Sequence, residues 1–448
     1  MANPRRLEEL GTLIDRNMPG IPARLPAPAL DQIAFLFHTF SDGQLRSVLS
    51  LDGQLDAERL KRAIRLTLDA EPILGCRFVQ QRRRPYWERR NDLDRLPLCP
   101  IIGCANPHIL EGELWRCMVT PMDATRDPIV EACLLRAERD TLVIKIHHSV
   151  ADGIGVLRYM TILAAIYREL SVNPDYQPRP NLDSRGQGQV IKRVGWLGML
   201  AALRHTQLPA VKPSWGPIAT GNDLSGRAFA LRRIGPERLR ALKAFGHAHG
   251  VTMNDILLAA FYRALFDTLD SPVGRSYLVG VPADLRRYLP RDQTVPVCNL
   301  VNSAQVAIIR ETSTTFDDTL RSVHAAMQAM KSTYPGLTWA VMSELMVLPS
   351  FAVANAAVQR LIKRTQPTGS AGPFLSNIGV IDERLLDFGG IEVADAYGLG
   401  TVSLPPGLLL AVSTFREIMT LAIGFCNTAT DCQLVERFLD RLVGELPA

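Results

Sequence analysis

The clearest change of hydrophobic pattern in the chain lies between residues 138 and 170. Residues 142–146 are mostly apolar and β-branched and follow a charged turn, which predicts a buried strand. From residue 154 onward, apolar side chains recur at helical spacing, which predicts a helix ending near residue 170. Between strand and helix stand His147, His148, Asp152 and Gly153. Such a junction can aim a side chain rigidly into a cleft, so this stretch is the candidate site.

The remainder of the first half predicts a mixture of helices and strands. Asp56 is expected to cap a helix over residues 56–68, whose apolar positions form one face. We expect the strand at residues 129–136 to form a hairpin with the strand that precedes the histidines. Further predicted elements are a charged helix at residues 5–17, an extended Pro-rich connector at 19–28, and strands at 32–40, 46–51 and 115–119.

The second half begins after a polar stretch rich in Pro and Gly at residues 173–189, which predicts a connector between two lobes. Thr252 and Asp255 have the spacing of a capping box and should open an apolar helix over residues 256–269. Other predicted elements are a strand at 228–234, a helix at 235–248, a hairpin of 411–415 with 419–426, and a closing helix at 431–446. We therefore divide the chain into an N-terminal lobe (1–180), a connector (181–222) and a C-terminal lobe (223–448).

Two apolar stretches lie outside this scheme. Residues 190–208 are expected to form a helix with one apolar face flanked by cations. Residues 345–359 are apolar, broken by Pro349 and followed by three cations. A basic amphipathic helix can lie on a membrane surface. A helix packed across the lobes, or the wall of an acyl-chain tunnel, is the alternative, and the sequence leaves these readings open.

Composition narrows the class of protein. The 448 residues are 47% hydrophobic and 21% charged, an ordinary globular balance, and the net charge of +5 gives no case for nucleic acid. The eight cysteines contain no CxxC pair, and no signal peptide or bilayer-length apolar run is visible. We therefore expect free thiols and a cytoplasmic location, with peripheral membrane contact left open.

The residue types at the candidate site suggest proton transfer. A neutral imidazole can take a proton from a hydroxyl or an amine near neutral pH. Metal ligation by the two histidines is an alternative, but no further ligands stand at a convincing spacing, and a purely structural pair is another. His247 and His249 could also be metal ligands, but Gly250 after them is typical of an exposed helix end. We expect no metal site.

The run His147-His148-Ser149-Val150-Ala151-Asp152-Gly153 resembles the HHxxxDG motif of the condensation-domain-like acyltransferases. That superfamily includes chloramphenicol acetyltransferase, peptide-synthetase condensation domains, the wax ester synthase/diacylglycerol acyltransferases and mycobacterial polyketide-associated acyltransferases. The resemblance implies that His148 is the general base and that Asp152 is structural through an arginine partner. It also implies an α+β, chloramphenicol acetyltransferase-like fold. Its two similar lobes are two-layer α/β sandwiches, with the active site in a tunnel between them.

Weaker resemblances extend this comparison along the chain. Residues 251–260 are similar to a helix start of the wax ester synthase branch, and residues 297–302 to a family segment in which Cys298 replaces a glycine. Residues 278–287 resemble the family strand that ends in an arginine, which makes Arg286 the expected partner of Asp152, with Arg287 as the competitor. Residues 374–379 resemble the family's SNvG segment, so Ser376 or Asn377 is a candidate oxyanion donor; the alternative is a polar turn.

The implied activity is transfer of an acyl group from a coenzyme A or carrier-protein phosphopantetheine thioester to a hydroxyl acceptor, forming an ester. The thioester is a co-substrate, and no tightly bound cofactor is expected. The sequence contains neither a G-x-S-x-G elbow nor an obvious nucleophilic cysteine, so no acyl-enzyme intermediate is expected. The alternatives are an amide-forming condensation enzyme that uses an acyl carrier protein, and a non-catalytic relative that binds a lipid or a partner. The acceptor could be a small molecule or a lipid, with an alcohol or amine group.

Overall fold

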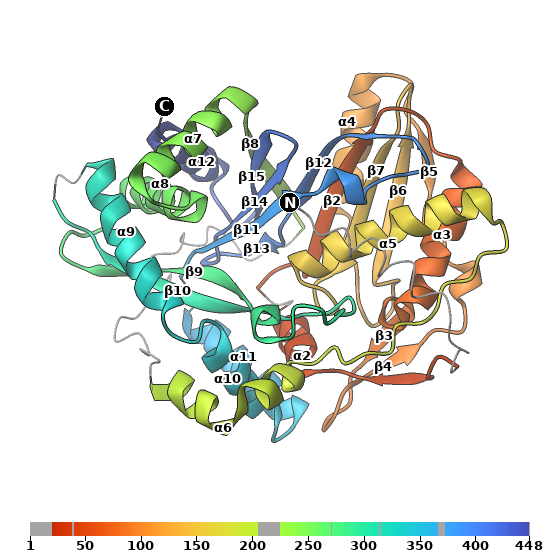
Figure 1. Ribbon diagram of the computed structural model, residues 1–448, viewed down its shortest axis with the longest axis horizontal. Helices are drawn as coiled ribbons and strands as arrows, with labels where there is room; N and C mark the ends of the chain where they lie inside the picture. The colour runs from red at the N-terminus through yellow and green to blue at the C-terminus, as the bar shows by residue number, and fades with distance from the viewer. Residues whose placement is uncertain are drawn as a thin grey trace.

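Two β-sheets organise the structure, a computed structural model that describes residues 20–37, 40–204, 225–269, 271–312, 315–365 and 372–447. Both sheets are covered by helices, and they lie side by side in Figure 1. The chain therefore has the α+β fold and the two lobes that the family resemblance implied.

The first sheet carries the candidate site. Its strand order is β12-β2-β7-β6-β5, in which β7 pairs antiparallel with both β2 and β6. Helices α3 and α5 cover one face and α4 covers the other. The bounds are β2 Gln44–Leu51, β5 Ile101–Gly103, β6 Val130–Arg136, β7 Thr141–His147, β12 Val393–Leu399, α3 Ala57–Ala70, α4 Pro107–Val119 and α5 Gly153–Val172. A small sheet of β1 (Arg24–Pro26), β4 (Tyr86–Arg89) and β3 (Cys76–Val79) lies beside it.

The second sheet has the order β10-β9-β11-β14-β15-β13, and β8 also pairs with β15. Helices α8, α9 and α12 share one buried core with this sheet. Its strands are β8 Arg227–Ile234, β9 Ser276–Asp284, β10 Val301–Ile309, β11 Phe374–Ile381, β13 Val402–Ser403, β14 Leu409–Phe415 and β15 Ile418–Cys426. Its helices are α7 Pro236–His249, α8 Met253–Thr268, α9 Phe316–Lys331 and α12 Cys432–Glu445.

A third group of helices gathers at the lower edge of the molecule in Figure 1. It consists of α2 (Ala29–Leu36), α6 (Gly188–Arg204), α10 (Leu337–Val347) and α11 (Phe351–Thr365). Helix α10 contacts the other three. No single helix among the described residues is long and apolar enough to cross a membrane. Helices α10 and α11 together have the length and apolar composition for it, but they are bent by 117° relative to one another.

Several local predictions are confirmed. β6 and β7 form the expected hairpin, β14 and β15 form the later one, and α12 closes the chain. The Asp56 side chain accepts from two backbone amides at the start of α3, and Thr252 with Asp255 forms the capping box of α8. These signals depend on near neighbours in sequence, which explains their success.

Two predicted strands are wrong. Residues 32–40 were expected to be a strand, but α2 occupies most of them because a short apolar run fits a buried helix equally well. Residues 115–119 are the last turns of α4, whose start is marked by the Asn106 cap and by Pro107. The predicted helix at 5–17 lies outside the described residues.

The second half of the chain contributes two segments to the first lobe. Strand β12 belongs to the C-terminal half of the sequence but forms the edge of the first sheet by pairing with β2. Phe351, Ala354 and Val358 of α11 likewise lie in the core of the first lobe. A single boundary near residue 223 therefore does not separate the two lobes in space.

Candidate active site

His148 stands in the turn between β7 and α5, where the sequence predicted it. The strand ends at His147, and α5 begins at Gly153 after Asp152, whose side chain accepts the Gly155 N–H at 2.8 Å as the helix cap. The four residues of the turn are thus held between a sheet and a capped helix. The backbone at His148 is therefore held by two elements of the first lobe.

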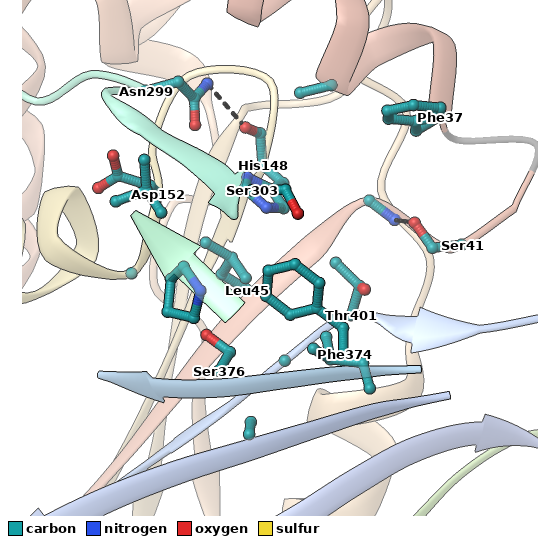
Figure 2. Close-up of a pocket in the computed structure, with 18 of the residues that line it drawn as sticks. Phe37, Ser41, Leu45, His148, Asp152, Asn299, Ser303, Phe374, Ser376 and Thr401 are labelled. Atoms are coloured by element: carbon teal, nitrogen blue, oxygen red, sulfur yellow. Dashed lines mark hydrogen bonds between the residues drawn. The ribbon is translucent and has the colours of Figure 1, made fainter. Parts of the chain in front are cut away.

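A hydrogen bond fixes the tautomer of His148. Its Nδ1 lies 2.9 Å from the carbonyl oxygen of Ala151. A carbonyl can only accept, so Nδ1 carries the proton of the neutral ring and Nε2 carries the lone pair. The ring lines a cavity between the lobes, as Figure 2 shows. This arrangement makes Nε2 a proton acceptor in the cavity.

Two contacts hold the main chain of His148. Its amide donates to the Gly43 carbonyl at 2.7 Å, and its carbonyl accepts the Asn299 side-chain amide at 2.9 Å, drawn as a dashed line in Figure 2. Asn299 precedes β10 of the second lobe and also donates to Asp31 at 3.3 Å. One side chain therefore connects the candidate base to the opposite lobe.

Asp152 is committed to structural contacts. Besides capping α5, its carboxylate accepts the Leu300 amide at 2.7 Å and the Arg286 guanidinium at 3.0 and 3.2 Å. Burial alone would lower the pKa of Arg286, but attraction to Asp152 and to Cys298 raises that pKa above its ordinary value. Arg287, the competing partner, is exposed and lies 5.7 Å from the ring centroid of Tyr288.

A second buried ion pair supports the same turn. Arg185, from the predicted connector, donates to Asp31 at 2.8 Å and to the Val150 carbonyl at 3.0 Å. Asp31 in α2 also accepts the Trp87 indole at 2.9 Å. Burial raises the pKa of Asp31, although the Arg185 guanidinium opposes that shift. The pair ties α2 and the connector to the carbonyl two residues beyond His148.

His147 is buried outside the cavity. Its Nδ1 lies 2.7 Å from the Ser149 hydroxyl and accepts the Ser149 amide at 3.2 Å. Its Nε2 lies against Gly43, where an added Cβ would be only 3.2 Å away and where φ is +63°. The two adjacent histidines thus point in different directions, and only His148 faces the cavity.

The cavity has a volume of about 520 Å³ and is lined by both lobes. Its wall is mainly apolar, with Leu30, Val156, Met346 and Phe374 among its residues. Polar groups are few and include the hydroxyls of Ser303, Ser376 and Thr401. An apolar pocket with a few convergent polar groups is typical of a small-molecule site.

The two candidate oxyanion donors lie on opposite faces of β11. Phe374, Ser376 and Ile378 line the cavity with His148. Asn377, one residue along, donates to Asn254 at 2.7 Å and lines a separate cavity of about 410 Å³. Successive strand residues face opposite ways, so the two side chains cannot enter one site. Ser376 is the one that lines the cavity of His148.

The glycine of the motif is explained by close packing. A Cβ on Gly153 would lie 2.7 Å from Cγ2 of Ile378 in β11. The start of α5 therefore approaches the second sheet more closely than any larger residue allows. Gly153 and Ile378 both line the cavity of His148.

No group of three or more potential metal-ligating side chains occurs among the described residues. At the end of α7, His249 Nδ1 donates to the Phe245 carbonyl at 2.9 Å and the His249 ring stacks on the Phe245 ring. Gly250 ends the helix in the left-handed conformation. The described part of the chain gives no support to metal ligation by His247 and His249.

A sequence model of the condensation domain family matches residues 44–338, which contain both the motif and Arg286. The chain belongs to the condensation domain family. Chondramide synthase of Chondromyces crocatus is 28% identical over 232 residues, which are 48% of this chain but 6% of the synthase. The chain thus spans a small fraction of the length of that relative.

Solved structures of low sequence identity share the fold of this condensation domain. The first condensation domain of the calcium-dependent antibiotic synthetase, in complex with a substrate analogue, has a TM-score of 0.70 at 19% identity and covers 94% of this chain and 95% of its own. Trichothecene 15-O-acetyltransferase of Fusarium sporotrichioides also reaches 0.70, at 17% identity, and covers 96% of this chain and 99% of its own.

Sequence reasoning missed part of the support around the condensation-domain motif. No chemical role was predicted for Asp31, and Arg185 lay in the predicted connector. Asn299 lay in a segment that was noted only because it resembles a segment of the family. A lone Asp in an apolar run could have drawn attention to Asp31, because a buried carboxylate needs partners. Arg185 carried no comparable signal.

Proposed function

We propose that this condensation-domain protein is an acyltransferase that moves an acyl group from a thioester to a hydroxyl acceptor and so forms an ester. The observation that carries the proposal is the fixed tautomer of His148, which presents the Nε2 lone pair to an apolar cavity. A hydroxyl is a weak nucleophile until a base takes its proton, so a positioned imidazole contributes most with this class of acceptor.

The proposed reaction needs one base and no covalent enzyme intermediate. His148 Nε2 takes the proton of the acceptor hydroxyl as its oxygen attacks the thioester carbonyl carbon. The tetrahedral intermediate collapses with cleavage of the C–S bond, and the proton on Nε2 passes to the departing thiolate. The ring ends neutral, and Ala151 holds its Nδ1–H throughout.

Two groups assist in this proposal without exchanging protons. Ser376 is the candidate donor to the tetrahedral oxyanion, because it lines the same cavity. Asp152 and Arg286 keep the turn and α5 in register with the second lobe, and they are positioning residues. Asn377 faces away from His148 and has no part in the proposed oxyanion site.

The donor in this proposal is an acyl thioester of coenzyme A or of a carrier protein's phosphopantetheine arm. Both carry the same thioester chemistry, and the family includes domains of multidomain synthetases. The thioester is consumed in the reaction, so the proposal includes no tightly bound cofactor.

The experiment is thiol release from acyl-coenzyme A donors of increasing chain length, and from acyl carrier protein, with separate pools of alcohols and amines. Products are identified by mass spectrometry. Ester formation with alcohols, dependent on His148, supports the proposal. Exclusive amide formation would replace it with the amide-forming alternative, which the similarity to a synthetase condensation domain favours. Failure to turn over any donor would favour a non-catalytic binding protein.

A further inference from the structure

Helices α6, α10 and α11 expose an unusual amount of apolar surface. Nine of the nineteen exposed large apolar residues in the described chain belong to these helices or to Leu348 at the end of α10. We refer to this surface as the helical face. It comprises Trp196, Leu197, Leu200, Trp339, Met342, Leu345, Leu348, Val353 and Leu361.

In the second half of α6, the large apolar side chains face the solvent. Ala202 is buried and its carbonyl accepts the Thr338 hydroxyl of α10 at 3.3 Å. Trp196 and Leu197 are instead 71% and 65% exposed. A surface helix of a soluble protein ordinarily buries its large apolar residues and exposes small or polar ones. This helix does the reverse.

Helix α10 repeats the arrangement and borders the cavity. It buries Leu337, Ala340 and Ser343, while Leu345 and its C-cap Leu348 are 54% and 75% exposed. Trp339 of the same helix is partly exposed and also lines the cavity of His148. The helical face therefore reaches the mouth of the candidate active site.

The charge on this surface is mainly positive. Helices α6 and α11 each carry three cations and no acidic residue. The acidic residue of α10, Glu344, accepts the Gln187 amide at 3.1 Å. Apolar side chains flanked by Lys and Arg are the pattern of a helix that lies at the surface of an anionic bilayer. Two copies of this face would bring like charges together, which disfavours self-association.

We infer that the helical face docks on an anionic lipid surface and presents the mouth of the cavity to it. Leucine and tryptophan side chains would enter the boundary between headgroups and acyl chains, while Lys192 and Arg193 of α6 would contact lipid phosphates. This inference goes beyond the proposed acyl transfer, because docking requires neither His148 nor a thioester.

The test is sedimentation of the full chain with phosphatidylcholine vesicles, with and without an equal share of phosphatidylglycerol. We expect binding to the anionic vesicles that falls at least tenfold without phosphatidylglycerol, and also at about 1 M salt, where the Debye length is about 3 Å. Trp196→Asp with Leu197→Asp should reduce binding at least tenfold, as should Lys192→Glu with Arg193→Glu. Neither pair lines the cavity.

The matched control is Val172→Asp, since Val172 is 83% exposed at the end of α5, outside the helical face. It should bind vesicles like the wild type, and circular dichroism should show the same fold in all variants. His148→Ala should also bind normally, which separates docking from catalysis. The inference would be overturned if the wild type did not bind vesicles, or if the Trp196/Leu197 double variant bound them as well as the wild type. It would also be overturned if the chain bound an acidic acyl carrier protein in the same assay but no vesicles.

Discussion

Replacement of Arg286 by alanine should destabilise the fold through the carboxylate that it leaves behind. The Arg286 side chain is 16% exposed and the Asp152 side chain 4%. After truncation, Asp152 would keep only the backbone donors at Gly155 and Leu300. Breaking a buried ion pair by removing one partner costs about 3–5 kcal/mol of unfolding free energy, because the remaining charge stays desolvated. Arg286→Ala is expected to fall in that range.

Two variants distinguish the effect of the unpaired Asp152 carboxylate from a nonspecific loss of stability. Arg286→Lys keeps a cation but loses the two-pronged contact with Asp152, and a loss of about 1.5–3 kcal/mol is expected from the missing charged hydrogen bond. Arg287→Ala changes the neighbouring exposed arginine and should cost no more than about 0.5 kcal/mol. The order of stability should therefore be Arg287→Ala, then Arg286→Lys, then Arg286→Ala.

Urea unfolding followed by far-UV circular dichroism gives the free-energy differences from the midpoints and slopes. The double variant Asp152→Ala with Arg286→Ala should lose less unfolding free energy than the sum of the losses of the two single variants, because no buried charge is then left unpaired. Equal destabilisation by Arg286→Ala and Arg287→Ala would refute the reasoning, and so would strict additivity in the double variant.

Three further predictions concern the interior. Gly153→Ala should destabilise by about 1–3 kcal/mol through the clash with Ile378, and Ile378→Ala in the same chain should restore part of the loss in urea unfolding. Burial raises the pKa of Glu71, so its contribution to stability is present below the ordinary value of 4.5 and lost as pH rises through the folded pKa. Glu71→Gln should therefore gain stability relative to wild type as the pH of the unfolding experiment is raised from below 4.5 to neutral. Cys432 is exposed and the other seven cysteines are buried, and burial raises the pKa of Cys298 to about 12. Iodoacetamide should therefore add one label to the native chain, as measured by mass spectrometry. Rapid labelling of several cysteines would contradict this packing.

The parts of the site that could be predicted from sequence are those encoded by near neighbours. A β-branched run, a capping aspartate and a helical repeat lie within thirty residues, and they locate His148 at the end of a strand. Resemblance to the family supplied Arg286 across the lobes, which local pattern could not have done.

The remaining support could not be predicted because its partners are far apart in sequence. Asp31 and Arg185 are 154 positions apart, and Asn299 reaches back 151 positions to the His148 carbonyl. No periodicity links such residues, and their meaning depends on burial, which the sequence does not state. The pairing of β12 with β2 was missed for the same reason, because most of the chain separates the two strands in sequence.

The most direct test of the account is the rate of acceptor-dependent thiol release by His148→Ala relative to wild type, with His108→Ala as the matched control. His108 is exposed on α4, outside the cavity. Loss of a general base typically lowers the rate about a hundredfold to ten-thousandfold. We predict a loss in that range for His148→Ala and none for His108→Ala. Equal thiol release by wild type and His148→Ala would contradict the assignment of His148 as the base.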